Sequence, residues 1–287
     1  FRLVEPRRVP CLLLENVTFM LQLAGGRALH VIMAELERLG YRWAYRVVDA
    51  RAFGLPQRRE RVFIVASLDD DPRRVLFADE AGVPGDVLRT NGVACGFYWT
   101  EGVRGLGWAV DAVPTLKGGS TVGVPSPPAI LMPDGDIVTP SLQDAERLQG
   151  FPKDWTKNAE SVGKRGMRWK LVGNAVNVPT VKWIAQRLAR PGEILDARVE
   201  RLASNGRWPR AAFNVGTGRY SIDMSAWPKH KPRQSLIEFV GDRGTPLSRR
   251  ATAGFLSRTQ RASLRFPEGF TDAVEAHLRR MEAAEAP

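Results

Sequence analysis

The sequence predicts an α/β fold, and the order of its apolar segments supports this prediction. Residues 9–14 form a short continuous apolar run, which is typical of a buried parallel strand. Apolar side chains at helical spacing predict a helix over residues 27–39, with Gly40 as its C-terminal cap. Further apolar runs predict strands over residues 41–50 and 61–67. A strand, a helix and two more strands in succession indicate an α/β protein.

The amino-acid composition of the sequence changes after the last of these strands. Between residues 68 and 140 glycine and proline become dense, so we expect a loop-rich insert or a small β domain. Ser141 is a suitable N-cap for a helix over residues 142–149, and Pro179 opens another helix. The remaining chain is mixed and basic, and it closes with a helix expected over residues 271–284.

The composition excludes several classes of protein. With 44% hydrophobic and 25% charged residues, the 287-residue chain is too apolar to be disordered. No run approaches the roughly 18 consecutive apolar residues of a membrane-spanning helix. Its two cysteines, Cys11 and Cys95, favour a reducing compartment over a disulfide scaffold, and its three histidines match no metal-ligand spacing. We therefore expect a cytoplasmic protein without a bound metal.

The net charge of the chain is a hint about its partners. Lys and Arg number 42 against 31 Asp and Glu, which gives +11 at neutral pH. Basic residues are spread over the whole chain, as suits a protein that lies along a polyanion such as nucleic acid. A GC-rich genome, which favours arginine codons, gives the same excess, so the charge leaves both explanations open.

Glu15, Asn16 and Val17 follow the first predicted strand directly. Open α/β sheets bind their ligands at the carboxyl ends of strands, which is where this segment lies. A glutamate in such a place either meets a ligand or pairs with a structural partner, because Glu is almost never buried alone.

Two other groups of segments carry candidate chemistry. Residues 57–61 (Gln-Arg-Arg-Glu-Arg) enter a strand, and Arg59 and Arg61 should point to one side of it. Two guanidinium groups on one face suit an anion or a base edge, although an exposed strand end gives the same pattern. Residues 150–152 (Gly-Phe-Pro) and 173–176 (Gly-Asn-Ala-Val) form turns next to helices. The second turn could hold an anion at a helix N-terminus, or could be a simple turn.

In this order, the segments resemble the motifs of the C5-cytosine DNA methyltransferase family. The resemblance covers about residues 1–190. The motifs that carry it are the Glu-Asn-Val motif at 15–17, the QxRxR motif at 57–61, the ninth motif at 144–152 and the GNxV motif at 173–176. Within the insert, residues 114–119 are similar to the Thr-Leu signature of the family's target-recognition domain.

The resemblance implies the C-terminal part of a Rossmann-like methyltransferase domain that depends on S-adenosylmethionine. It implies four regions: a partial catalytic domain over 1–67, a target-recognition region over 68–140, a return to the catalytic domain over 141–190, and a C-terminal extension of unknown role over 191–287.

The implied activity is that of a DNA (cytosine-5)-methyltransferase of a restriction-modification system, with double-stranded DNA as its partner. Such enzymes flip the target cytosine out of the duplex into a pocket. A Cys thiolate attacks C6, C5 takes the methyl group from S-adenosylmethionine, and elimination frees the product. Glu15 would hold N3 and the exocyclic amine and Arg61 would reach O2.

The resemblance also assigns the other site residues. Arg59 joins Glu15 and Arg61 in the catalytic set, where it would support the site together with Gln57. The cofactor residues would be Asn174, Ala175 and Val176. The residues that would contact or position DNA are Asn16, Gln57, Thr115, Lys117, Gly118 and Gly119. The enzyme would act in the cytoplasm, associated with the nucleoid.

The sequence departs from the family pattern in two ways. The family's nucleophile lies in a Pro-Cys-Gln segment upstream of Glu-Asn-Val, and its cofactor loop has the pattern FxGxG; this sequence contains neither. Cys11 follows a proline but precedes Leu12, so we expect it to be packed in the core. Cys95 lies in the insert and is an equally poor candidate.

We therefore expect the chain not to methylate DNA by itself. The first hypothesis is that it is the C-terminal part of a single-chain methyltransferase, which the absence of an initial Met favours. The second is that it is the DNA-recognition subunit of a split enzyme, whose complementary N-terminal chain carries the nucleophile. A non-catalytic DNA-binding protein derived from the family is a third alternative.

Overall fold

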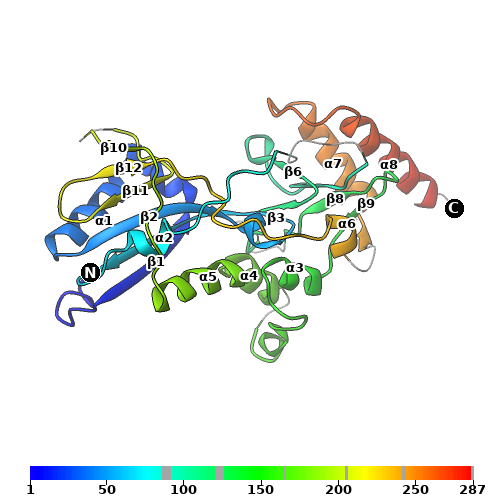
Figure 1. Ribbon diagram of the computed structural model, residues 1–287. Helices are drawn as coiled ribbons and strands as arrows, with labels where there is room; N and C mark the ends of the chain where they lie inside the picture. The colour runs from blue at the N-terminus through cyan, green and yellow to red at the C-terminus, as the bar shows by residue number, and fades with distance from the viewer. Residues whose placement is uncertain (86–91, 120–125, 164–165, 204–205, 241–243, 286–287) are drawn as a thin grey trace. The chain divides into compact units, whose positions relative to one another are not determined.

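The computed structural model describes residues 1–85, 92–119, 126–163, 166–203, 206–240 and 244–285 (Figure 1). The chain divides into two compact units. Unit 1 contains Phe1–Phe53, Glu60–Pro84 and Pro179–Lys231, and unit 2 contains Gly54–Arg59, Gly85–Val178 and Pro232–Pro287. Each unit has its own sheet and its own buried side chains. The domain boundaries expected after residues 67, 140 and 190 stay predictions.

Unit 1 is built on a six-stranded sheet in which every pair of neighbours is antiparallel. The order of its strands is β1 (Cys11–Val17), β4 (Glu60–Ser67), β2 (Arg42–Asp49), β11 (Ala211–Asn214), β12 (Tyr220–Ile222) and β10 (Val199–Arg201). Its helices are α1 (Arg27–Arg38), α2 (Arg73–Leu76) and α5 (Val178–Ala189), with short 3₁₀ helices at Thr18–Leu21, Leu23–Gly26 and Ala50–Phe53. The strand–helix combination confirms the predicted α/β class.

The prediction that the first strand is buried and parallel is wrong. β1 and β2 do run in the same direction, as a strand–helix–strand crossover requires, but β4 lies between them and is antiparallel to both. β1 is the edge strand of this sheet, and its side chains alternate between exposed and half-buried. The continuous apolar run therefore predicted the presence of the strand correctly, but not the direction of its neighbour or its burial.

The end of α1 agrees with the prediction for Gly40. Its φ is +83°, a conformation that glycine adopts at no steric cost. The amide of Gly40 donates to the carbonyl of Glu37, and the amide of Tyr41 donates to that of Leu36. These two bonds form a Schellman cap, which turns the chain directly into β2.

The C-terminal extension contributes to both units. Residues up to Lys231 form β10–β12 and widen the unit 1 sheet beyond β2, whereas the rest belongs to unit 2. With β11 at its side, β2 is a central strand and is buried on both faces from Trp43 to Asp49. Arg46 is completely buried there, and its guanidinium donates to three carbonyl groups and pairs with Glu80 at 2.6 Å.

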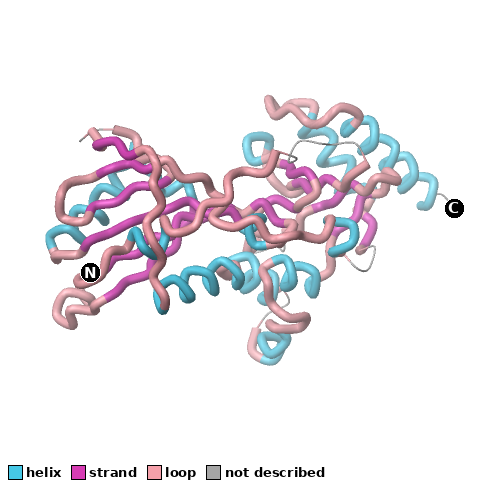
Figure 2. Tube along the Cα trace, in the orientation of Figure 1, coloured by secondary structure: helices cyan, strands magenta, loops and turns pink. Residues whose placement is uncertain are grey.

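Unit 2 contains short strands joined by long loops, as Figure 2 shows. Its five-stranded antiparallel sheet has the strand order β13 (Thr245–Pro246), β9 (Ile137–Thr139), β8 (Ala129–Leu131), β5 (Cys95–Phe97) and β6 (Trp108–Val110). A separate two-stranded parallel sheet is formed by β3 (Gln57–Arg58) and β7 (Val113–Pro114). The helices are α3 (Leu142–Leu148), α4 (Met167–Asn174), α6 (Leu236–Phe239), α7 (Arg249–Thr259) and α8 (Phe270–Glu285), with 3₁₀ helices at Val103–Gly105 and Lys157–Ser161.

Several expectations for this part of the chain are confirmed. In the described part of the glycine-rich stretch, the strands have two or three residues each. Ser141 caps α3, where its hydroxyl accepts from the amide of Asp144 and the Asp144 carboxylate accepts from the Ser141 amide. The final helix α8 lies one residue beyond each end of the predicted range. Among the described residues, no helix is long and apolar enough to cross a membrane.

Candidate functional site

The carboxylate of Glu15 and the guanidinium of Arg61 form an ion pair in unit 1. Nε of Arg61 lies 2.9 Å from Oε1 of Glu15. In the register of β1 and β4, Glu15 is opposite Phe63 and Val17 is opposite Arg61, so both charged side chains lie on one face. Their side chains are 27% and 13% exposed, respectively. The strand register therefore fixes a charged pair that solvent, or a ligand, can reach.

β1 presents this pair at the edge of the sheet. Among the described residues, its only ladder partner is β4. Large apolar side chains on and after β1 are exposed, namely Leu13, Val17, Phe19 and Leu23. A sheet edge with unpaired backbone groups and apolar side chains is a template for pairing with another segment.

Arg59 has different partners from Arg61, although only one residue separates them. It lies in unit 2, is 3% exposed, and donates to the carbonyls of Leu116 at 3.1 Å, Gly173 at 3.3 Å and Ala175 at 2.8 Å. These bonds join the chain after β3, the chain after β7 and the end of α4. The contacts of Arg59 are those of a residue that holds backbone segments together.

Gln57 holds the same segments from the other side. Its side chain is fully buried, its Nε2 donates to the carbonyl of Leu148 at 2.7 Å, and its Oε1 accepts from the amide of Leu116 at 3.1 Å. The neighbouring Gln149 donates from Nε2 to the carbonyl of Val172 at 2.8 Å. We call this meeting of residues 57–59, 115–118, 148–149 and 172–175 the loop junction. Gln149 was not among the predicted site residues, although it lies in the segment that resembles the ninth motif.

Two backbones touch inside the loop junction. A Cβ atom at Gly173 would lie 2.1 Å from the carbonyl carbon of Lys117 and 2.2 Å from the amide nitrogen of Gly118. A Cβ at Gly118 would lie 2.8 Å from Oδ1 of Asn174. Glycine at these two positions therefore lets the Thr-Leu segment lie directly against the GNxV turn.

The predicted DNA-contacting residues of this segment are partly exposed. The hydroxyl of Thr115 donates to the carbonyl of Arg58 at 3.0 Å. The ammonium group of Lys117 lies 3.0 Å from Glu101 and 4.1 Å from the ring centroid of Tyr98. Gly118 and Gly119 follow and are partly exposed as well. The structure thus brings Gln57, Arg59 and this segment together in unit 2.

The predicted cofactor residues lie at the edge of the same junction. Asn174 is exposed, and Ala175 and Val176 are partly exposed. The carbonyl of Ala175 is bonded to Arg59, so a ligand here would meet side chains more than backbone acceptors. In unit 1, Asn16 is exposed at the end of β1, and its Oδ1 accepts from the amide of Val17 at 2.8 Å.

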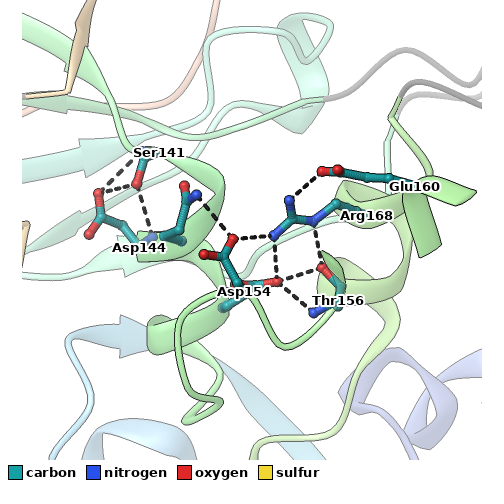
Figure 3. Close-up of polar contacts among 8 residues, drawn as sticks. Ser141, Asp144, Asp154, Thr156, Glu160 and Arg168 are labelled. Carbon is teal, nitrogen blue, oxygen red and sulfur yellow. Dashed lines mark hydrogen bonds and ion pairs between the residues drawn. The ribbon is translucent and has the colours of Figure 1, made fainter. Parts of the chain in front are cut away.

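An ionic network centred on the buried Arg168 and Glu146 joins the segment between α3 and α4. Figure 3 shows Arg168 directed toward Glu160 on one side and toward Asp154 and Thr156 on the other. The fully buried Glu146 accepts from Arg168 at 3.1 Å and from the amide of Thr156 at 2.8 Å. The three carboxylates and the buried hydrogen bonds make Arg168 a structural residue, which the sequence alone did not single out.

Neither cysteine is placed as a nucleophile. The prediction that Cys11 packs in the core is wrong, because Cys11 is exposed at the first residue of an edge strand. It lies about 13 Å from Glu15 along β1, at roughly 3.3 Å per residue, and partial burial and the charge of Asp70 raise the pKa of its thiol. Cys95 is buried, which raises the pKa of its thiol to about 12. Both thiols are therefore protonated at neutral pH.

Comparisons with known proteins give consistent results. Residues 1–84 and 139–190 match the family model described as C-5 cytosine-specific DNA methylase. The chain is 45% identical over 291 residues to the type II methyltransferase M2.BsuMI of Bacillus subtilis (strain 168), which covers 96% of this chain and 74% of that protein. It is 27% identical to the type II methyltransferase M.MspI of Moraxella sp, over 66% of this chain and 48% of that protein.

Among solved structures, the crystal structure of S. pombe Dnmt2 methyltransferase matches 62% of this chain and 64% of that chain, with 19% identity and a TM-score of 0.43. The family model leaves out residues 191–287, but the similarity to M2.BsuMI extends over most of them. The predicted family is confirmed by the family model and by the similarity to M2.BsuMI. The chain belongs to the C-5 cytosine-specific DNA methylase family.

Proposed function

We propose that the chain is the base-binding and DNA-recognition part of a DNA (cytosine-5)-methyltransferase that acts on double-stranded DNA. The observation that carries this proposal is the Glu15–Arg61 ion pair, with 2.9 Å between Nε and Oε1, at the carboxyl end of β1. Family membership supplies the reaction class, and the pair supplies the chemistry that a flipped cytosine requires. Asn16, beside the pair, would contact the DNA next to the flipped base.

Glu15 and Arg61 have complementary tasks in this proposal. Cytosine presents N3 and an exocyclic amine on one edge, which a carboxyl group can hold, and a carbonyl oxygen at O2. A guanidinium carries five N–H donors, so Arg61 can hold Glu15 and still donate to O2. When the nucleophile adds to C6, charge develops on the ring, and donors already fixed in place stabilise that charge without reorganising.

The loop junction in unit 2 positions the remaining groups. Arg59 and Gln57 hold the backbone, so we assign them supporting roles rather than contact with DNA. Thr115, Lys117 and the two glycines after them would contact DNA phosphates or bases. Because Lys117 is already paired with Glu101, its contribution to DNA binding would require exchange of that pair.

S-adenosylmethionine supplies the methyl group in this family. Asn174, Ala175 and Val176 expose side chains from a backbone that Arg59 and the Gly118–Gly173 contact hold in place. They fit as one wall of a cofactor site. The sequence contains no FxGxG loop, so a full cofactor site needs residues beyond this sequence.

The nucleophile must likewise come from a Pro-Cys-Gln segment that this sequence does not contain. We propose that this segment belongs to a complementary stretch of polypeptide that adds a strand to the exposed edge of β1. The apolar side chains Leu13, Val17 and Phe19 support this proposal, because strand addition would cover them. We expect the enzyme in the cytoplasm beside the nucleoid, because its proposed substrate is cellular DNA.

The test of this function is Glu15→Gln in the protein that also contains the nucleophile segment. We expect methyl transfer to fall by about 100-fold or more, since Gln cannot share a proton with N3, while duplex binding changes by no more than about 2-fold. Glu35→Gln is a matched control: Glu35 is 28% exposed and pairs with Arg38 at 2.7 Å, but lies on α1. Unchanged turnover in Glu15→Gln would refute the proposed role, as would an equal loss in the control.

The third alternative, a DNA-binding protein without catalytic function, predicts no methyl transfer in the presence of the nucleophile segment, with or without Arg61. An Arg61 side chain that serves only the flipped base is dispensable in a protein that never flips one. Retention of normal methyl transfer by Arg61→Ala would count against our assignment, and loss of transfer with retained duplex binding would support it.

A further inference from the structure

A cavity of about 290 Å³ lies in unit 1, outside every motif of the sequence analysis. It is formed mostly by the C-terminal extension. The side chains that decide its chemistry are His30, Arg201, Arg207, Trp208 and Arg219. Among the described residues that line it, none is acidic, so the cavity is a concentration of positive charge.

Arg219 is fixed at the cavity by Glu37. Its Nε and Nη2 donate to the two carboxylate oxygens of Glu37 at 2.8 and 2.7 Å. Its Nη1 lies 3.0 Å from Nδ1 of His30. Because a guanidinium has only donors, Nδ1 of His30 must accept, and the ring proton is on Nε2. His30 is therefore an oriented donor.

Trp208 forms the apolar part of the cavity and is equally fixed. Its Nε1 donates to the carbonyl of Gly26 at 3.0 Å. Its ring is T-shaped against Trp43 and Tyr45, with centroids 6.2 and 6.1 Å away, and the guanidinium of Arg219 lies 5.6 Å from its centroid. A Cβ at Gly26 would come within 2.9 Å of this ring, so glycine there allows the close contact.

Arg201 and Arg207 differ from Arg219 in that they are exposed. On β10, Glu200 points to the opposite side of the strand from Arg201, and Glu200 is paired with Arg198 at 2.6 Å. Glu37 is occupied by Arg219. The nearby carboxylates are thus directed elsewhere, and the charge of Arg201 and Arg207 faces solvent at the cavity.

Part of the cavity lies near the end of the sheet that carries the Glu15–Arg61 pair, and through the strand registers Arg201 is level with Leu13, two residues before Glu15. Arg210, which follows the cavity residues, accepts at its carbonyl from the amide of Val47 and pairs with Glu60 at 2.8 Å. Glu60 and Arg61 form the start of β4, where β1 ends. The cavity is on the opposite face of the sheet from Glu15, three strands away from β1.

Three strand spacings of about 4.8 Å separate β1 from β11, and about 10 Å separates the two faces of the sheet. The cavity and the ion pair are therefore on the order of 15–20 Å apart. At about 3.4 Å per base pair, five or six base pairs of duplex span that distance. A duplex that crosses this end of the sheet would therefore reach both places.

We propose that this cavity binds a backbone phosphate of duplex DNA, several base pairs from the flipped cytosine. The inference rests on the proposed function, which brings DNA to this end of the sheet. Arg201 and Arg207 would neutralise the phosphodiester, the Nε2–H of His30 would donate to it, and Arg219 and Trp208 would form a fixed wall. Such a contact positions the duplex and carries no sequence information.

The experiment compares the salt dependence of duplex binding between Arg201→Gln/Arg207→Gln and the unchanged chain, from about 50 to 200 mM salt. Each lost phosphate contact reduces the magnitude of the negative slope of log K against log salt by about 0.9, so for one phosphate we expect a reduction of about 0.9 in the double variant. Arg42→Gln/Arg74→Gln is the matched control, because both arginines are exposed in unit 1 and neither lines the cavity. The slope of log K against log salt should be the same in this control variant as in the unchanged chain.

Each outcome decides the proposal. An unchanged slope in Arg201→Gln/Arg207→Gln overturns it, as does an equal decrease in the control pair, which would mean a general charge effect. Loss of affinity for inorganic phosphate or a mononucleotide, with an unchanged duplex slope, also overturns it in favour of a free-anion site. Failure of this inference leaves the proposed function intact, because methyl transfer by Glu15→Gln tests that function separately. Absence of duplex binding at all salt concentrations overturns both.

Discussion

Gly173 is the residue on which the geometry of the loop junction depends most. Its Cα hydrogen faces the peptide between Lys117 and Gly118, and a methyl group in its place would lie within 2.2 Å of two backbone atoms. Main-chain atoms cannot rotate away as the end of a flexible side chain can. The GNxV turn and the Thr-Leu segment must therefore separate if the glycine is replaced.

We predict that Gly173→Ala destabilises the protein by about 1–3 kcal/mol, the usual cost of forcing extra volume into a packed site. Denaturant unfolding measures this change. Gly102→Ala is the control, because Gly102 has φ −65° and no heavy atom within 4 Å of an added Cβ. There the substitution should be neutral or slightly stabilising. Equal stability of the two variants would contradict the described contact.

The structure shows where the predicted site residues lie, and their roles stay predictions. Glu15 and Arg61 were expected at one site, and the strand register does pair them. Arg59 was expected to share a face with Arg61, but it is bonded to carbonyls contributed by distant parts of the chain. Period-two reasoning holds only within a strand, and β4 begins at Glu60, so it does not extend back to Arg59.

At the scale of elements, the buried carboxylate of Asp79 links α5 to the rest of unit 1. Asp79 accepts from Nε1 of Trp183 at 2.7 Å and from Nε and Nη2 of Arg187 at 2.7 and 2.6 Å, and it also contacts Lys229. Burial by itself would raise the pKa of Asp79, but the hydrogen bonds from Arg187, Lys229 and Trp183 outweigh burial and hold this pKa well below its usual range.

This shift predicts a pH dependence of stability. The folded pKa is lowered, so the stabilisation is present above the unfolded pKa of about 3.9 and is lost as pH falls below it. We expect the free energy of unfolding to fall below about pH 4 in the unchanged protein, and Asp79→Asn to lack this component and to be less stable at neutral pH. The exposed Asp196 provides the control Asp196→Asn. An identical acid dependence in both variants would show that Asp79 does not carry the effect.

Helix ends were predicted correctly where they depend on residues close together in the sequence. The Schellman cap at Gly40 and the capping box at Ser141 depend on residues next to one another, and both were readable from the sequence. The partner of β1 was not, because its pairing depends on β4, which the chain reaches about 45 residues later. The strands β10–β12 were missed because each has only three or four residues, too few for a period to be recognised.

At the scale of the whole molecule, the net charge of +11 has more than one source. Several arginines are buried and bonded within the protein, as Arg46, Arg59 and Arg168 are, so their charge is not available to DNA. Arg201 and Arg207 are exposed at a cavity and are the ones we assign to DNA. A count of charges in the sequence cannot separate these groups, because the fold decides which carboxylate each guanidinium meets.

The central claim is that the Glu15–Arg61 pair serves a cytosine whose C5 receives a methyl group. The most direct measurement is the chemical identity of the product made in a host without cytosine methylation, when this chain is expressed with a segment that carries the Pro-Cys-Gln nucleophile. We predict 5-methylcytosine at one recurring sequence, mapped as cytosines that resist bisulfite conversion, and its loss in Glu15→Gln. Methylation at N4 of cytosine or N6 of adenine, or 5-methylcytosine that persists in Glu15→Gln, would contradict the account.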